Sequence, residues 1–272
     1  MKRPIGVIDS GVGGLTVAHE MMRQLPNETL IYLGDTLRCP YGSRSEQEII
    51  QFTNEMVDFL LKKNIKMLVI ACNTATAYTL ENLRKTLPIP VLGVIKPGAR
   101  AAIKMTVSNS IGVIGTEATI KSNAYEKALK NIKPEIEVQS LPCPLFVPMV
   151  ESGILSGRKA EEIVRESLAP FIKQKNMDTL VLGCTHYPLL KETIQSVTGD
   201  DIKIISSSDE TAREASAILE VHELLRADDD KTDHMFYTTG ELDVFERITR
   251  ELFKTTVHDI QKVNIHQINN SI

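Results

Sequence analysis

Short apolar runs alternate with helix-like stretches along the first third of the chain. Residues 5–8 form such a run, the glycine-rich segment 9–14 follows it, and residues 15–24 have the apolar spacing of a helix. Further short apolar runs lie at residues 30–33, 67–71 and 91–94, and we expect helices between them. This order is typical of a parallel sheet covered on both faces, because parallel strands need crossover connections. We therefore predict an α/β fold built on doubly wound parallel sheets.

An internal repeat divides the chain into two similar halves. Residues 5–10 (IGVIDS) resemble residues 111–116 (IGVIGT), and residues 68–74 (LVIACNT) resemble residues 180–186 (LVLGCTH). The two offsets, 106 and 112 residues, differ by no more than a loop insertion. The repeat predicts two related α/β domains, each with a cysteine at the carboxyl end of one strand.

The two cysteines of the repeat, Cys72 and Cys184, indicate a reactive site. In open parallel sheets ligands bind beyond the carboxyl ends of the strands. Each thiol is expected just before a helix, whose N-terminal N–H groups stabilise a thiolate. Two domains facing each other across a cleft would place these thiols opposite one another. The remaining cysteines, Cys39 and Cys143, lie beside prolines and have no partner in the repeat, so we expect them to be bystanders.

Three kinds of chemistry could use these thiols. A reversible disulfide would make a redox protein, but thiol oxidoreductases usually place both cysteines close in sequence. A single nucleophile would pair Cys184 with His186, although we expect an extended chain to direct these two side chains apart. A thiolate base on one face of a substrate carbon and a thiol acid on the other would invert a stereocentre. The duplication favours this last arrangement, because it needs two similar half-sites.

Composition and the remaining motifs exclude several classes of function. The chain of 272 residues has a net charge of −4 and dispersed basic residues, which does not favour nucleic-acid binding. It has no apolar run long enough to cross a membrane and no secretory pattern at its start, so we expect a cytoplasmic protein. It also lacks CxxC pairs, an HExxH sequence, a nucleotide-binding glycine motif and a pyridoxal-phosphate lysine motif. We therefore expect chemistry on a small-molecule substrate without a metal or cofactor.

Four segments closely resemble motifs of the bacterial glutamate racemase family. They are DSGVGGL at residues 9–15, GDTLRCPYG at 34–42, ACNTA at 71–75 and GCTHYPLL at 183–190. The resemblance extends from Asp9 to FYTTG at residues 236–240 in the family's order and spacing, and THYP is its most specific part. It implies a cofactor-independent isomerase that interconverts L- and D-glutamate by a two-base mechanism and supplies D-glutamate for peptidoglycan synthesis.

The resemblance also implies roles for individual residues. Cys72 would take the α-proton from D-glutamate with the help of Asp9, and Cys184 would take it from L-glutamate with the help of His186. Hydroxyl, amide and backbone groups would hold the two substrate carboxylates. The implied contacts are Asp9, Ser10, Tyr41, Gly42, Asn73, Thr74, Thr116, Thr119, Thr185 and His186.

Three acidic residues are further candidates, and two of them have a structural alternative. Glu151 and Asp35 match acidic positions implicated in the family's sites, and we count Glu151 among the candidate catalytic residues. From the sequence alone, Glu151 could instead favour the start of a helix. Asp9 could equally be the N-cap of the helix that follows it.

The domain boundaries follow from the same resemblance. It implies a first domain of residues 1–96 with 208–272, carrying Cys72, and a second of residues 97–207, carrying Cys184, related by pseudo-twofold symmetry around an active-site cleft. The sequence alone would suggest two consecutive halves. Aspartate or another small acidic amino acid is the alternative substrate, and a noncatalytic binder of an acidic metabolite is the alternative class. Apart from the substrate, the partner we consider is a second copy of the chain, in a homodimer; the sequence does not decide between monomer and homodimer.

Overall fold

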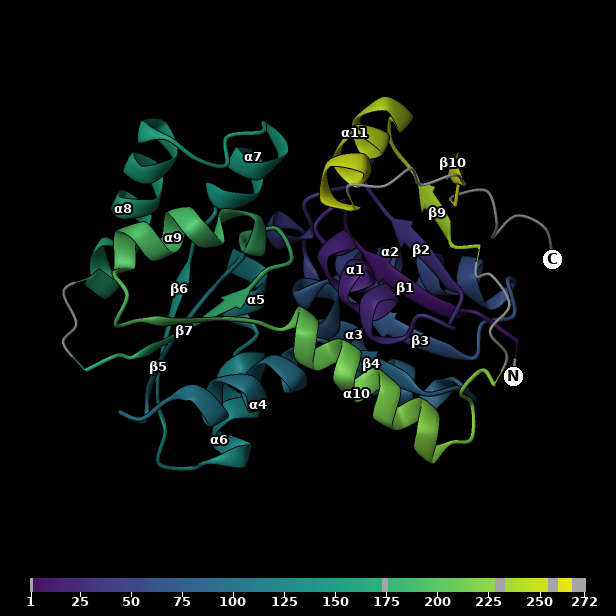
Figure 1. Ribbon diagram of the computed structural model, residues 1–272, viewed down its shortest axis with the longest axis horizontal. Coiled ribbons are helices and arrows are strands. Elements are labelled where there is room, and N and C mark those ends of the chain that lie inside the picture. Colours follow the sequence, from purple (N-terminus) through teal and green to yellow (C-terminus); the bar gives the residue numbers. More distant parts are fainter. Residues whose placement is uncertain (1, 173–175, 228–232, 254–258, 266–272) are drawn as a thin grey trace. The chain divides into compact units, whose positions relative to one another are not determined.

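The computed structural model describes residues 2–172, 176–227, 233–253 and 259–265. The chain divides into two compact units, the first unit (Met1–Val94 with Ser208–Ile272) and the second unit (Ile95–Ser207), both drawn in Figure 1. Helix α4 (Ile95–Met105) packs on elements of the second unit and belongs wholly to it. The junction therefore lies after residue 94 rather than after residue 96.

The first unit is built on a parallel sheet whose described strands have the order β10-β9-β2-β1-β3-β4. These strands are β1 (Ile5–Asp9), β2 (Leu30–Gly34), β3 (Met67–Ile70), β4 (Val91–Gly93), β9 (Met235–Thr238) and β10 (Ile260–Lys262). The four predicted apolar runs thus form strands. The last two strands come from the C-terminal segment and extend the sheet beyond β2.

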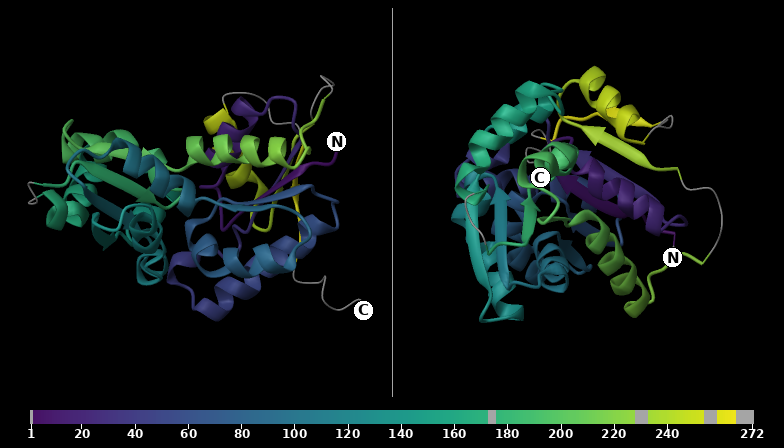
Figure 2. Two further views of the ribbon diagram at one scale, coloured as in Figure 1. Left: turned by 90° about the horizontal axis from the view of Figure 1, so that it is seen from below. Right: turned by 60° about the vertical axis from the view of Figure 1, so that its left-hand side comes forward.

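Helices cover both faces of this sheet. α1 (Leu15–Gln24) packs against α10 (Ser208–Val221) and α11 (Leu242–Phe253), while α2 (Glu46–Leu61) packs against α3 (Asn73–Thr86). The left view in Figure 2 shows the green helix α10 and the blue helices on opposite faces. Strands β1, β2 and β3 are buried along their whole length, as expected for a doubly covered sheet. The buried strands therefore hold the residues that follow their carboxyl ends in fixed positions.

The second unit repeats this architecture. Its parallel sheet has the order β6-β5-β7-β8 among the described residues, with β5 (Ser110–Gly115), β6 (Glu137–Pro142), β7 (Thr179–Gly183) and β8 (Lys203–Ser206). Besides α4, its described α-helices are α5 (Glu117–Lys121), α6 (Ala124–Ile132), α7 (Phe146–Glu151), α8 (Arg158–Ile172) and α9 (Lys191–Thr198). α4 and α6 pack together on one face, and α8 and α9 pack together on the other (Figure 1).

The sequence repeat coincides with a repeat of strand order. The order β2-β1-β3-β4 in the first unit corresponds to β6-β5-β7-β8 in the second. The repeated segments form β1 and β5 in one pair, and β3 and β7 in the other. Cys72 and Cys184 therefore follow strands that occupy equivalent positions in their own sheets. The predicted fold class, parallel α/β sheets in two domains, is confirmed.

None of the described helices is long and apolar enough to cross a membrane. The longest of them, α2, has 16 residues and carries four acidic side chains, Glu46, Glu48, Glu55 and Asp58.

His234 forms a hydrogen bond with the first residue of β2, and protonation of its ring would break this bond. Its Nδ1 accepts a hydrogen bond from Leu30 N at 3.2 Å, and burial lowers the pKa of His234 despite the opposing charge of Asp233. Below about pH 6.5 the unfolded chain therefore binds a proton that the folded chain resists, so stability falls as the pH drops through this range. Asparagine offers an acceptor at a similar position without titrating. We expect the unfolding free energy of the wild type to fall relative to His234→Asn between pH 7.5 and 5, measured by urea unfolding. Parallel pH profiles of the two proteins would contradict this.

Candidate active site

The carboxyl edge of the first unit's sheet carries one group of predicted site residues. Strand β1 pairs with β3, with Ile8 beside Ile70, so the segments that leave these two strands are neighbours. The loop after β2 forms a short 3-10 helix, η1 (Tyr41–Ser43), which packs against α3. These segments hold Asp9, Ser10, Tyr41, Gly42, Cys72, Asn73 and Thr74, all of them buried.

Cys72 is the N-cap residue of α3. Its Sγ accepts a hydrogen bond from Ala75 N at 3.4 Å and donates one to Ser10 Oγ at 3.5 Å. The residue is only 4% exposed, and Asn73 and Thr74 begin the helix beside it. Cys72 thus precedes a helix, as predicted, and the first N–H groups of a helix stabilise negative charge.

Asp9 is fully buried at the end of β1. Its Oδ2 accepts a hydrogen bond from Gly11 N at 2.9 Å, whereas the N-cap of α1 is Gly14. The alternative that Asp9 caps this helix is therefore wrong. A Cβ at Gly14 would lie 2.4 Å from Asp9 Cβ, so glycine is required for the backbone to approach this carboxylate.

Tyr41 is held by Asp35 from the end of β2. The Tyr41 hydroxyl donates to Asp35 Oδ2 at 2.5 Å, and both side chains are buried. Burial and the neighbouring Asp35 carboxylate raise the pKa of Tyr41 far above its usual value, so its hydroxyl stays protonated and remains a donor. Asp35 thus contacts a predicted substrate-binding residue.

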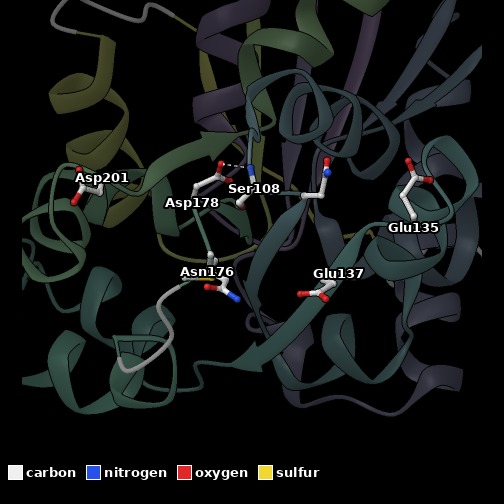
Figure 3. A pocket seen from close by; sticks show the side chains of 8 residues that line it. Ser108, Glu135, Glu137, Asn176, Asp178 and Asp201 are labelled. Atoms are coloured by element: carbon white, nitrogen blue, oxygen red, sulfur yellow. Dashed lines mark hydrogen bonds between the residues drawn. The ribbon is translucent and has the colours of Figure 1, made fainter.

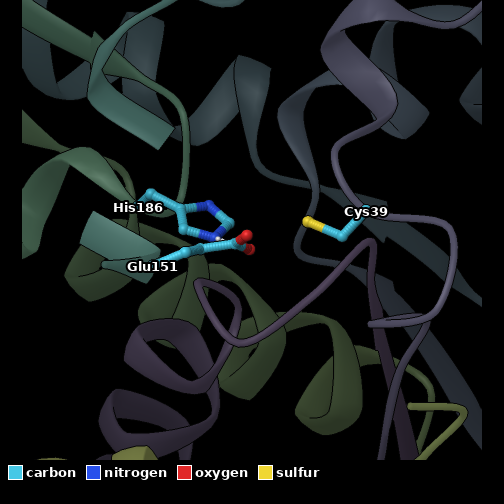
Figure 4. Close-up of side chains that lie close together, drawn as sticks. All are labelled: Cys39, Glu151 and His186. Carbon is cyan, nitrogen blue, oxygen red and sulfur yellow. Dashed lines mark hydrogen bonds and ion pairs between the residues drawn. The ribbon is translucent and has the colours of Figure 1, made fainter. Parts of the chain in front are cut away.

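A thiol, an imidazole and a carboxylate form a chain in the second unit. Cys184 Sγ lies 3.9 Å from His186 Nδ1, and His186 Nε2 lies 3.3 Å from Glu151 Oε1. Figure 4 shows the Glu151 carboxylate directed at the His186 ring; Cys39, also drawn there, belongs to the first unit. Cys184 and His186 are 6% and 2% exposed, while the Glu151 side chain is 39% exposed. This order of groups resembles the nucleophile, base and orienting residue of a catalytic triad.

Three expectations about this segment are wrong. Cys184 does not precede an α-helix, because a turn and the 3-10 helix η2 (Tyr187–Leu190) separate it from α9, and Pro188 lacks a backbone donor. The turn, unlike an extended chain, brings Cys184 and His186 side by side. Glu151 ends α7 rather than beginning a helix.

Three threonines lie near Cys184 in the fold. Thr116 follows β5, which pairs with β7, so Thr116 and Cys184 leave neighbouring strands. Thr116 is the N-cap of α5, and its hydroxyl donates to Thr119 Oγ1 at 3.0 Å. Thr185 is buried next to the thiol. The predicted site residues of the second unit thus share its carboxyl edge, apart from Glu151 on α7.

The fully buried thiol of Cys143 has a different environment. Burial, with a smaller contribution from Cys184, raises the pKa of Cys143 to about 12. A thiol with such a pKa stays protonated near neutral pH and is a poor nucleophile. This agrees with the expectation that Cys143 is a bystander.

An open pocket of about 600 Å³ lies at the opposite, amino edge of the second unit's sheet (Figure 3). Its labelled side chains are Ser108, Glu135, Glu137, Asn176, Asp178 and Asp201. Asp178 accepts hydrogen bonds of 2.7 Å from Thr106 Oγ1, Val107 N and Ser108 N. Burial alone would raise the pKa of Asp178, but these bonds hold it well below its usual value. Asp178 therefore stabilises a turn, and the pocket contains none of the predicted site residues.

Two residues that support these groups have no role predicted from the sequence. Tyr187 donates from its hydroxyl to Cys143 O at 2.9 Å, tying η2 to the segment before α7. Thr239 donates to Asp35 Oδ1 at 2.8 Å from the C-terminal segment. Both lie in segments singled out above, GCTHYPLL and FYTTG, which was the available signal.

The sequence and the fold are both similar to those of known racemases. Residues 5–215 match the family described as Asp/Glu/Hydantoin racemase. A glutamate racemase from Oceanobacillus iheyensis is 61% identical over 99% of this chain and 97% of its own length. The crystal structure of a glutamate racemase isoform from Bacillus anthracis has a TM-score of 0.91 at 47% identity, covering 97% of this chain and 98% of that one. The structure of a Francisella tularensis glutamate racemase in complex with D-glutamate has a TM-score of 0.90 at 37% identity, with the same coverage.

Proposed function

Because the chain belongs to the Asp/Glu/Hydantoin racemase family, we propose that it is an amino-acid racemase. Its similar relatives are glutamate racemases, so we propose L- and D-glutamate as its substrates and two cysteines as its bases. The observation that carries the proposal is one buried thiol just beyond the carboxyl end of the equivalent strand of each sheet, Cys72 after β3 and Cys184 after β7. Inversion at one carbon needs a base on one face and an acid on the other. The reaction therefore requires both thiols to reach the same α-carbon from opposite sides.

The proton balance is symmetric in the two directions. With D-glutamate, the Cys72 thiolate takes the α-proton, and the C–H electron pair stays on the α-carbon as a carbanion adjoining the carboxylate. The Cys184 thiol then donates its proton to the other face, which gives L-glutamate and leaves Cys72 as thiol and Cys184 as thiolate. L-glutamate starts from this second form and follows the reverse course.

Each thiol has neighbours that suit this role. At Cys72, Ala75 N and the start of α3 stabilise the thiolate, and the buried Asp9 carboxylate belongs to the adjoining strand end. At Cys184, a hydrogen bond from His186 Nε2–H to Glu151 would leave the lone pair of Nδ1 facing the thiol. His186 can then accept the proton of Cys184, and the imidazolium so formed would be stabilised by Glu151.

The remaining polar groups suit a substrate with two carboxylates. Ser10, Asn73 and Thr74 line the segments around Cys72, and the hydroxyls of Thr116, Thr119 and Thr185 lie at the corresponding edge around Cys184. Hydrogen-bond donors of this kind hold carboxylates without strongly stabilising the bound ground state. In the cell the enzyme would work in the cytoplasm without a cofactor and supply D-glutamate for peptidoglycan, alone or as a homodimer.

An exchange experiment tests this function. The purified protein is incubated in deuterated water with L- or D-glutamate, and optical rotation and loss of the α-proton signal are followed without any added cofactor. We expect both enantiomers to converge on a racemic mixture whose product carries deuterium at the α-carbon. Faster turnover of aspartate in a parallel reaction would favour the alternative substrate. Glutamate binding without exchange would instead indicate a noncatalytic binder.

A further inference from the structure

We infer that Thr239, in the C-terminal segment, is a positioning residue for the substrate-binding loop at residues 35–43. This inference rests on the proposed function, which assigns Tyr41 and Gly42 of that loop to substrate binding. Thr239 is 4% exposed, and among the described residues its hydroxyl bonds to the loop and to neither thiol.

The Thr239 hydroxyl joins two points at the start of the loop. Its Oγ1 accepts a hydrogen bond from Leu37 N at 3.0 Å and donates one to Asp35 Oδ1 at 2.8 Å. A single buried hydroxyl thus uses its donor and an acceptor site on one short segment. Removing it would leave the Leu37 amide and a buried oxygen of the Asp35 carboxylate each short of a partner.

Asp35 passes this restraint on to Tyr41. Its second oxygen, Oδ2, accepts from Tyr41 OH at 2.5 Å and from Arg38 Nε at 2.6 Å. Arg38 also forms an ion pair with Glu55 of α2 and lies over the Phe52 ring. The Asp35 carboxylate therefore connects Thr239 on one side with Tyr41 and Arg38 on the other, and its orientation sets the position of η1.

The neighbouring residues of the C-terminal segment reinforce this tie. Strand β9 pairs with β2, with Thr238 beside Gly34, and Thr239 N donates to Gly34 O at 3.1 Å. Thr36 Oγ1 lies 2.5 Å from Thr238 Oγ1 and accepts from Gly240 N at 2.8 Å. A Cβ at Gly240 would lie 2.5 Å from Thr36 Oγ1, so only glycine allows this approach. The register of β9 thus holds Thr239 against the loop.

Thr239→Val tests the inference, because valine keeps the shape of the side chain and removes its hydroxyl. We expect KM for both glutamate enantiomers to rise about tenfold while kcat stays within about twofold, since the loop would bind ground state and transition state alike. Thr239→Ser keeps the hydroxyl and is expected to stay close to the wild type. Thr249→Val is the matched control: Thr249 is also buried, in α11 of the same segment, but among the described residues its hydroxyl bonds only to Phe245 O in its own helix. General destabilisation would lower the active fraction and hence kcat, not raise KM.

Hydrogen exchange gives a second readout that does not depend on glutamate. In Thr239→Val the amides of residues 35–44 are expected to exchange faster than in the wild type, and those of Thr239→Ser and Thr249→Val at the wild-type rate. Unchanged exchange in Thr239→Val, equal effects of valine and serine, or an unchanged KM in an enzyme that racemises glutamate would each overturn the inference. If the wild type does not racemise glutamate, the proposed function fails, while exchange still decides whether Thr239 holds the loop.

Discussion

Cys72→Ser and Cys184→Ser are each expected to lower kcat/KM for racemisation by about 10²- to 10⁴-fold in both directions. A serine hydroxyl is a far weaker acid than a thiol, so it can neither provide the anion that takes the α-proton nor return a proton efficiently to the carbanion. Both directions suffer because each cysteine is the base in one direction and the acid in the other. Polarimetry with L- and D-glutamate as separate starting substrates measures the two rates.

Cys143→Ala is the matched control for the cysteine variants. Cys143 is also a buried thiol of the second unit, but its pKa of about 12 keeps it protonated, and the mechanism does not use it. Its loss should leave kcat/KM within about threefold of the wild type, whatever it does to stability. Full activity in Cys72→Ser with none in Cys184→Ser would contradict the two-base mechanism. It would favour a single nucleophile with His186 as its base.

The fold class could be predicted because its signals are local. Runs such as residues 67–71 are short, branched and bounded by polar turns, and they form strands buried on both faces. The pairing of β9 with β2 has no such signal, since it joins Leu33 to Tyr237 across most of the chain. The strand order of the first unit therefore needed the structure, or a resemblance to a known family, to be recognised.

The candidate site likewise contains residues with a local sequence signal and residues whose contacts have none. Cys72 and Ser10 leave neighbouring strands. The strand pattern and the repeat are enough to select Cys72, whereas Ser10 is implied only by the resemblance to a known family. The orientation of His186 differs from the prediction because a turn of a few residues, rather than an extended chain, follows Cys184. Thr239 and Asp35 are 204 residues apart, and nothing in either local sequence indicates their contact.

The buried ion pair of Lys66 and Glu28 is expected to be the most sensitive point of the first unit's stability. Lys66 Nζ lies 2.6 Å from Glu28 Oε2, and the two side chains are 0% and 2% exposed. Lys66 Nζ also donates to Leu224 O at 2.7 Å, and Glu28 Oε1 accepts from Arg226 N at 2.8 Å. The pair thus ties the segment after α10 to the amino edge of the sheet.

Lys66→Met should lower the free energy of unfolding by about 3–5 kcal/mol, because it leaves the Glu28 carboxylate buried without its cation. The double variant Lys66→Met/Glu28→Gln removes that charge as well and keeps an acceptor for Arg226 N, so it should recover part of the loss. Lys62→Met, at an exposed lysine nearby, should change stability by less than about 0.5 kcal/mol. Urea unfolding of the four proteins measures these differences. Equal losses in Lys66→Met and the double variant would mean that the cost comes from the lost contact with Leu224 O rather than from an unpaired charge.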